Sequence, residues 1–434
     1  MSNTFAKMSV EERIEVLSSK YYGMVFLGMA AAAYVDDGGR SKQKISNALS
    51  EAIDRQGYIR PLPELGQEGM SAPSAVVPGR WSLDWGPAIN DDLSNLIYVA
   101  SYRDEEDQPY FFVVGIRGTD TSAPPEAIVG QILEDMNAFK IKNWPEELAK
   151  APNPMKRADF PKGAVATGSA MAALLMIEQE PTPPNSPDVR PQQMQKLAKA
   201  LDLLIGGTDV PIVVTGHSLG GCQTQTIASY LQWQFPGNTV IPHAFAPSTA
   251  GDATFISANV FSRGYFWVNT LDLVPYGYIK IPLLGDDDRG ATKTHYEIGA
   301  RWAVNNLWNR FEWPADDPEL KGTGPAMPYR KELDDLIKGL GGILKLYNYS
   351  RPGPSNVVEM GGRMPPSDVL GPFYDAIKYR PAGTWKTDID PAKTYADGIN
   401  VLMWQHFPPN YQRLMWEYHQ AEMVYFDYGL FFDA

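Results

Sequence analysis

Apolar and polar positions follow two different spacings along the central part of the chain. The segments 96–100 and 110–116 are apolar runs separated by a charged turn, which predicts a β-hairpin. The second run is apolar at consecutive positions, as expected for a strand that helices cover on both faces. Apolar residues then recur at helical spacing, which predicts helices over 126–139, 164–178 and 191–205.

Strand and helix patterns continue to alternate after residue 206. The predicted order is strand, helix, strand, helix and strand, at 211–215, 222–235, 239–245, 252–262 and 265–269. Such alternation over about 96–275 predicts an α/β fold with a mainly parallel central sheet flanked by helices. Another apolar segment, 22–35, also has helical spacing and is too short for a transmembrane segment.

The motif Gly-His-Ser-Leu-Gly-Gly at 216–221 stands directly between the predicted strand at 211–215 and the helix after it. This order is typical of a nucleophile elbow, a sharp turn that presents a serine at the end of a strand. Small residues are needed on both sides of the serine because the strand and helix backbones pass closely there. Ser218 is therefore the candidate nucleophile. The alternative interpretation is a glycine-rich loop with an incidental serine.

A serine nucleophile needs a neighbouring base, and histidine has the pKa suited to that role. Of the five histidines, His217 is expected to point away from the partner of the nucleophile, and His243 lies on the next predicted strand. In an α/β-hydrolase the acid and then the histidine follow the serine in the chain. This order leaves His295, His406 and His419 as candidate bases.

Asp272 is the candidate acid because it follows the predicted strand at 265–269, where a carboxylate can orient the histidine. The alternative for Asp272 is a turn-forming or helix-capping role, and Asp252 and 286–288 are further candidate acids. The oxyanion needs backbone donors. Candidates are the N–H groups of Leu219, directly after the serine, and of Thr119, which follows the strand at 110–116.

Four segments in this order resemble the class 3 lipases, also called fungal-type triacylglycerol lipases, of the α/β-hydrolase superfamily. The Arg-Gly-Thr at 117–119 resembles the oxyanion loop of that family, and 216–221 is its elbow. The segments 244–251 and 269–275 resemble its Thr-Phe-Gly-x-Pro and Asn-x-x-Asp-x-Val-Pro segments. The resemblance covers about residues 20–282. In contrast, 165–169 lacks the histidine and phenylalanine of the family's Val-His-x-Gly-Phe segment.

The resemblance implies roles for the candidate residues. Ser218 would be the nucleophile, Asp272 the acid, and Thr119 and Leu219 the oxyanion donors. His406 and the residues after it resemble the family's late histidine motif, so His406 is the favoured base. By the same comparison His295 resembles a histidine that is not catalytic, and it stays an alternative together with His419.

The span between the acid and the favoured base is longer than a catalytic loop requires. We expect a hydrolase core over 1–282, an inserted cap, lid or extended-core region over 283–400, and a C-terminal segment over 401–434 that returns the histidine to the core. Many aromatic residues, prolines and glycines occur in the insertion. That composition suits a wall of an apolar acyl pocket, and equally an extra part of the core.

Composition narrows the choice of partners and compartments. The net charge of −13 argues against nucleic acid as a partner, because its phosphates would repel the protein. The single cysteine, Cys222, allows no disulfide within the chain and is expected to be a small buried helix residue. No basic signal segment precedes 22–35, so we expect a cytoplasmic protein or one exported without a recognisable signal peptide.

The combined prediction is a serine hydrolase that cleaves carboxylic esters of lipids through an acyl-enzyme. The expected partners are a lipid or small ester substrate and a transient lipid interface. No metal or organic cofactor is expected, because the sequence has no clustered ligand set. The alternatives are a phospholipase or an acyltransferase that uses the same three residues, or a catalytically silent scaffold of the same fold.

Overall fold

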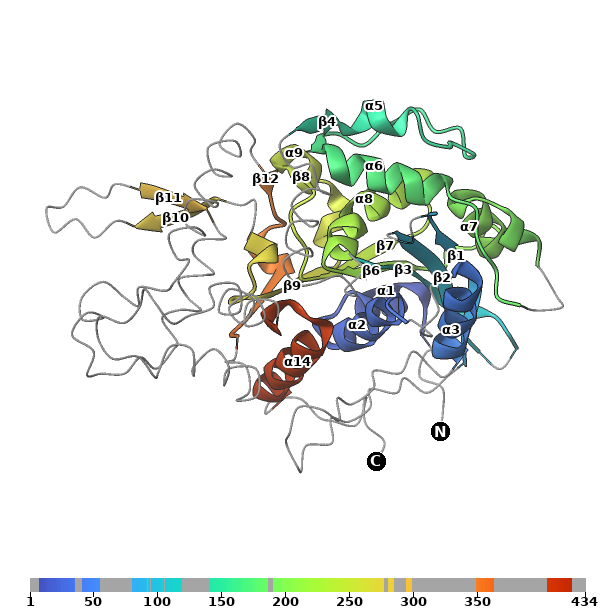
Figure 1. Ribbon diagram of the computed structural model, residues 1–434, viewed down its shortest axis with the longest axis horizontal. Coiled ribbons are helices and arrows are strands. Elements are labelled where there is room, and N and C mark those ends of the chain that lie inside the picture. Colours follow the sequence, from blue (N-terminus) through green and yellow to red (C-terminus); the bar gives the residue numbers. More distant parts are fainter. Residues whose placement is uncertain are drawn as a thin grey trace, which may run out of the picture.

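A seven-stranded sheet in the order β1-β2-β3-β6-β7-β9-β13 forms the centre of the computed structural model (Figure 1). The structure describes residues 8–35, 41–54, 80–91, 93, 95–104, 106–118, 140–185, 190–276, 280–284, 294–298, 349–362 and 404–423. The strands are β1 (Arg80–Ile89), β2 (Leu96–Arg103), β3 (Pro109–Ile116), β6 (Ile212–His217), β7 (Val240–Phe245), β9 (Tyr265–Asn269) and β13 (Val357–Met360).

The first three strands pair antiparallel, and every pairing from β3 to β13 is parallel. Helices cover both faces of this sheet (Figure 1). One face carries α6 (Thr167–Glu178), α7 (Leu197–Ile205) and α8 (Leu219–Gln234). The other carries α1 (Val10–Leu17), α2 (Gly23–Ala32), α3 (Lys42–Asp54) and α14 (Pro408–Met423). The predicted α/β fold with a mainly parallel sheet is therefore confirmed.

The strand β3 explains why its sequence is apolar at consecutive positions. Side chains alternate between the two faces of a strand. Phe112 and Val114 pack in the hydrophobic cluster that includes α8, whereas Phe111 and Val113 pack in the cluster that includes α2. All four are fully buried, and burial of each such side chain contributes about 1.5–3 kcal/mol to folding.

Several predicted helices have different limits in the structure. The segment 164–178 begins with a strand, β5 (Ala164–Ala166), and 191–205 divides into η3 (Pro191–Met194) and α7. The segment 252–262 divides into α9 (Ala253–Ile256) and η4 (Asn259–Ser262), because Ala258 between them has an extended backbone. Such local breaks leave the apolar spacing of a sequence almost unchanged. The predicted helix at 126–139 lies outside the described residues.

A second sheet has four strands in the order β12-β8-β5-β4. Its strands besides β5 are β12 (Tyr349–Ser350), β8 (Gly251–Asp252) and β4 (Ile141–Asn143), and β10 (Lys280–Leu284) and β11 (Thr294–Ile298) form a separate antiparallel pair. The remaining short helices are η2 (Lys20–Tyr22), α5 (Trp144–Leu148), η5 (Val274–Tyr276) and η6 (Pro354–Asn356). Most of the expected insertion at 283–400 lies outside the described residues. Within it, β12 is a strand of the four-stranded sheet and β13 is a strand of the seven-stranded sheet.

Buried polar side chains of the sheet hold α2 in place. The Thr215 hydroxyl donates to the carbonyl of Phe26 at 3.0 Å, and the Tyr98 hydroxyl donates to the carbonyl of Met29 at 2.6 Å. Tyr34, just after α2, is thereby brought beside the end of β6. In the part of the chain that the structure describes, no helix combines the length and apolar character needed to cross a membrane.

Candidate active site

The turn at Ser218 joins β6 to α8 through a sharp change of backbone direction. Ser218 has φ 60° and ψ −127°, a backbone conformation that costs a non-glycine residue about 1–3 kcal/mol. A Cβ atom at Gly216 would lie 2.3 Å from the carbonyl oxygen of Gly220, and one at Gly220 would lie 2.4 Å from the carbonyl oxygen of Ile116. Both glycines are therefore required by the close approach of the backbones, as the motif predicts.

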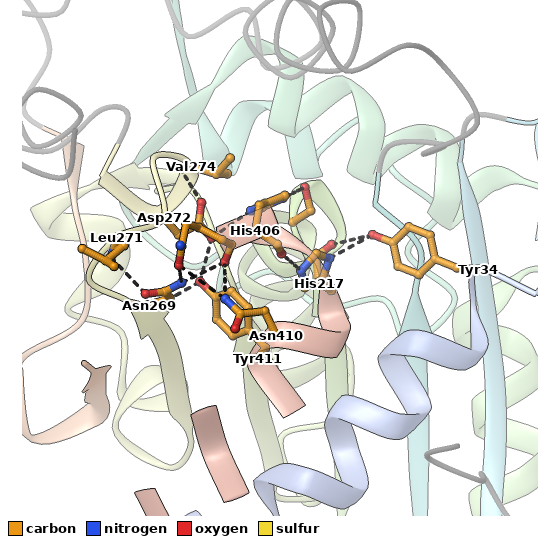
Figure 2. Close-up of polar contacts among 11 residues, drawn as sticks. Tyr34, His217, Asn269, Leu271, Asp272, Val274, His406, Asn410 and Tyr411 are labelled. Atoms are coloured by element: carbon orange, nitrogen blue, oxygen red, sulfur yellow. Dashed lines mark hydrogen bonds and ion pairs between the residues drawn. The ribbon is translucent and has the colours of Figure 1, made fainter. Parts of the chain in front are cut away.

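Three candidate residues that are distant in the sequence meet beside this turn. The Ser218 Oγ atom lies 2.7 Å from His406 Nε2, and His406 Nδ1 lies 2.8 Å from Asp272 Oδ2 (Figure 2). Because a carboxylate only accepts, the Nδ1–H group donates to Asp272, and Nε2 can accept the serine hydroxyl. The side chains come from the end of β6, the turn after β9 and the segment before α14. All three residues are buried, with exposed fractions of 4 % or less.

The carboxylate of Asp272 has further donors on both oxygens. The Tyr411 hydroxyl donates to Oδ2 at 2.7 Å, and the Val274 N–H donates to Oδ1 at 3.0 Å (Figure 2). The Tyr411 oxygen in turn accepts the N–H of Asn269 at 3.0 Å. Burial, and then the negative charge of Asp272, raises the pKa of Tyr411 well above its ordinary value, so the hydroxyl keeps its proton.

The side chain of Asn269 joins the acid turn to the segment before α14. Its amide nitrogen donates to the backbone carbonyl and to the side-chain oxygen of Gln405, each at 2.9 Å. Its amide oxygen accepts the N–H of Leu271 at 3.0 Å. Gln405 directly precedes His406, so these contacts fix the backbone on which the imidazole is carried. The sequence reasoning did not find the roles of Tyr411, Asn269 and Gln405.

His217 does not point where the sequence analysis expects. Its Nε2 atom lies 2.7 Å from the carbonyl oxygen of His406, and the centres of the two imidazole rings are 4.9 Å apart (Figure 2). The expectation that His217 points away from the partner of the serine is therefore wrong. Alternation along β6 supplies the reason, because Thr215 and His217 share one face and Thr215 contacts α2 on that face.

The remaining candidates occupy other places. Leu219 is the first residue of α8, where a backbone N–H has no partner within the helix. Thr119 and the acids at 286–288 lie outside the described residues. The alternative histidines His295 and His419 belong to β11 and α14. Asp252 caps α9 by accepting the N–H of Phe255 at 2.8 Å, which gives that carboxylate a structural role.

Cys222 is fully buried in α8, as expected, and its Sγ atom lies 3.3 Å from the Ser169 hydroxyl. Burial raises the pKa of its thiol to about 11 and keeps it protonated at neutral pH. Among the described residues, no three or more His, Cys, Asp and Glu side chains gather in a way that could hold a metal ion.

One protein-family model matches part of the chain. Residues 113–278 match the family model "Lipase (class 3)". No curated protein sequence matches the chain. Similar solved structures include a mutant of MDLA from Penicillium cyclopium, at 15 % identity, with 64 % of this chain and 86 % of that chain covered and a TM-score of 0.35.

Two further solved structures are similar. The Lip2 lipase of Yarrowia lipolytica is 17 % identical, with 59 % of this chain and 72 % of that chain covered and a TM-score of 0.36. The lipase of Rhizopus microsporus var. chinensis is 15 % identical, with 66 % of this chain and 82 % of that chain covered and a TM-score of 0.37. Residues 113–278, which hold the elbow and the acid turn, are therefore similar to the class 3 lipase family.

Proposed function

We propose that this protein hydrolyses carboxylic ester bonds of lipids through a serine-bound acyl intermediate. Ser218 attacks the ester carbonyl while His406 takes the proton from its hydroxyl. Asp272 holds the imidazole in the required tautomer and stabilises it when it becomes positively charged. The alcohol leaves with the proton from His406. Water then attacks the acyl-enzyme with His406 again as the base. The bond between Ser218 Oγ and the acyl carbon breaks, His406 returns the proton to Oγ, and the fatty acid is released.

The observation that carries this proposal is the continuous hydrogen-bonded chain from Ser218 to His406 to Asp272, at 2.7 and 2.8 Å. Ser218 is also held in an unfavourable backbone conformation at the start of a helix. Ser218 is the N-cap residue of α8, and the free backbone N–H groups at a helix N-terminus favour negative charge nearby. We assign the N–H of Leu219 as one oxyanion donor and that of Thr119 as the other.

The assignment of Ser218 is tested by covalent labelling with a fluorophosphonate probe and by hydrolysis of a p-nitrophenyl ester. Ser218→Ala should abolish labelling and lower kcat about 10⁴-fold or more, and His406→Ala should lower kcat to a similar extent. Ser257→Ala changes an exposed serine at the end of α9 and serves as the control with wild-type activity. Wild-type hydrolysis by Ser218→Ala would contradict the proposal.

The preference for lipids is tested with p-nitrophenyl esters of increasing acyl length, each measured in solution and at an oil–water interface. A lipid hydrolase should favour the longer chains and gain rate at the interface, because an apolar site binds more acyl surface there. Preference for the shortest ester and an equal rate in both media would instead identify an esterase of small soluble substrates.

A further inference from the structure

We propose that Tyr34 and His217 form a hydrogen-bonded bridge that positions two loops on either side of Ser218. One is the turn at 117–118 that leads to the proposed oxyanion donor, and the other is the segment 404–407 that carries His406. This inference rests on the proposed function. Tyr34 and His217 are positioning residues, since neither acts on the ester itself. The bridge is built from contacts other than the side-chain hydrogen bonds that join Ser218, His406 and Asp272.

The direction of the first hydrogen bond is fixed by its acceptor. A backbone carbonyl can only accept, so His217 must carry a hydrogen on Nε2 and donate it to the carbonyl of His406 at 2.7 Å. Burial, and then the neighbouring His406, lowers the pKa of His217 well below its ordinary value. The ring therefore stays neutral, and its Nδ1 atom is an acceptor.

Tyr34 completes the bridge on the other side. Its hydroxyl oxygen lies 3.3 Å from His217 Nδ1 and 3.2 Å from the His217 carbonyl oxygen, so His217 offers two acceptors to the hydroxyl hydrogen. The same oxygen accepts the N–H of Gly118 at 3.1 Å. The hydroxyl thus contacts both the elbow and the turn at 117–118, and Figure 2 shows its contact with His217.

The turn at 117–118 packs closely against Tyr34 and the elbow. A Cβ atom at Gly118 would lie 2.4 Å from the Tyr34 hydroxyl, 2.5 Å from the His217 carbonyl oxygen and 3.0 Å from Ser218 Cβ. Gly118 immediately precedes Thr119, the proposed oxyanion donor. A shift of Tyr34 would therefore move the proposed oxyanion donor and the imidazole relative to the serine. Misplacement of this kind slows the chemical step more than it weakens substrate binding.

A purely structural role would be to hold α2 on the sheet. That role can be separated from positioning, because Tyr98 also holds α2 through a buried hydroxyl that donates to the carbonyl of Met29. Tyr98→Phe is therefore a matched control, since it removes one hydroxyl from a buried tyrosine that contacts the same helix. It should lower the melting temperature and leave kcat within about twofold of the wild type.

The test measures kcat and KM with a soluble short-chain ester, together with the rate of fluorophosphonate labelling. Tyr34→Phe should lower kcat about tenfold with KM nearly unchanged, and labelling should slow in parallel. His217→Leu should lower kcat about a hundredfold. His217→Gln should have a kcat about tenfold higher than that of His217→Leu, because an amide can still donate to the His406 carbonyl. The double variant Tyr34→Phe, His217→Leu should be no slower than His217→Leu alone.

Three results would overturn the bridge. These are full kcat in Tyr34→Phe, equal kcat in His217→Gln and His217→Leu, or an equal loss of kcat in Tyr98→Phe. If Tyr34→Phe does not fold, the kcat values of His217→Gln and His217→Leu still test the bridge. Failure of the proposed function is a different outcome, since the wild type would then show no hydrolysis or labelling that depends on Ser218.

Discussion

Asp272 offers two carboxylate oxygens, and three donors occupy them. His406 and Tyr411 share Oδ2, while the backbone N–H of Val274 holds Oδ1. A buried carboxylate needs such donors, because an unsatisfied charge in a low-dielectric site is costly. Tyr411 differs from the other two donors in that its oxygen also accepts the N–H of Asn269. It therefore connects the carboxylate to the end of β9.

Replacement of Tyr411 by phenylalanine should affect both catalysis and stability. Tyr411→Phe removes a hydrogen bond to a charged group, which is worth about 1.5–3 kcal/mol, so kcat should fall at least tenfold. It also leaves the buried N–H of Asn269 without its acceptor, which should lower the free energy of unfolding by about 1–3 kcal/mol. Steady-state kinetics and denaturant unfolding measure the two effects.

Tyr230→Phe is a suitable control for that experiment. The Tyr230 hydroxyl donates to the carbonyl of Pro152 at 2.9 Å, away from Asp272. Its removal should lower stability and leave kcat unchanged. If Tyr411→Phe and Tyr230→Phe had the same kcat, the contact between Tyr411 and Asp272 would have no part in the reaction.

The turn from β6 into α8 depends on the absence of side chains at two positions. Gly220→Ala would place a methyl group against the backbone of Ile116 and Arg117, which cannot rotate away as a flexible side chain can. We expect the free energy of unfolding to fall by at least about 1–3 kcal/mol, as for other overpacked sites. Labelling of Ser218 should also slow, because β3 and α8 must separate to relieve the contact.

Gly237→Ala is the control for the turn, since a methyl group at Gly237 would meet no atom within 4 Å. Its stability should stay within about 0.5 kcal/mol of the wild type in the same denaturant titration. A Gly220→Ala variant as stable as Gly237→Ala would show that the approach of β3 and α8 is not tight.

The strands that were predicted from sequence are those with continuous apolar runs, namely β2, β3, β6, β7 and β9. β1 was missed, because Gly86 and Pro87 interrupt its pattern and its pairing with β2 shifts register twice. β13 was missed because it has four residues and pairs with a strand about 90 residues earlier in the chain. Local spacing carries no information about such a distant partner.

In the candidate site, too, residues marked by the local sequence were predicted, and contacts between distant positions were not. Ser218 and Asp272 stand out because a motif or the end of a strand marks them, and chain order reduced five histidines to three candidates. The contacts of Tyr411 and His217 carried no such mark, since they join positions 139 and 189 residues apart. The sign that Tyr411 is close to the acid was its place one turn after the favoured histidine.

Two buried histidines should make the stability of the entire protein depend on pH. Burial lowers the pKa of His243 to about 4, although its hydrogen bond to the Leu17 carbonyl acts in the opposite direction, and burial also lowers the pKa of His217. Unfolded histidines titrate near 6.5, so the unfolded chain binds more protons below that pH. The free energy of unfolding should therefore fall as the pH decreases from about 6.5 to about 4, by roughly 3 kcal/mol for His243.

The contribution of His243 is measured by denaturant unfolding of the wild type and of His243→Phe at several pH values. The phenylalanine ring can occupy the place of an imidazole that packs 4.7 Å from the ring of Phe26. The variant should lose less stability than the wild type between pH 6.5 and pH 4, whatever its stability at neutral pH. If the free energy of unfolding of the two proteins changed equally with pH, the pKa of His243 would not differ between the folded and unfolded states.

The segment that carries His406 lies 188 residues after Ser218 in the chain, yet the two side chains are in hydrogen-bond contact. Closing so long a loop costs entropy before any contact compensates for it, so distant pairings of this kind form late in folding. A chain growing on the ribosome exposes its serine long before the imidazole has been synthesised. Under the proposed mechanism the nascent protein should therefore be inactive, and hydrolysis should begin only when the segment around α14 docks.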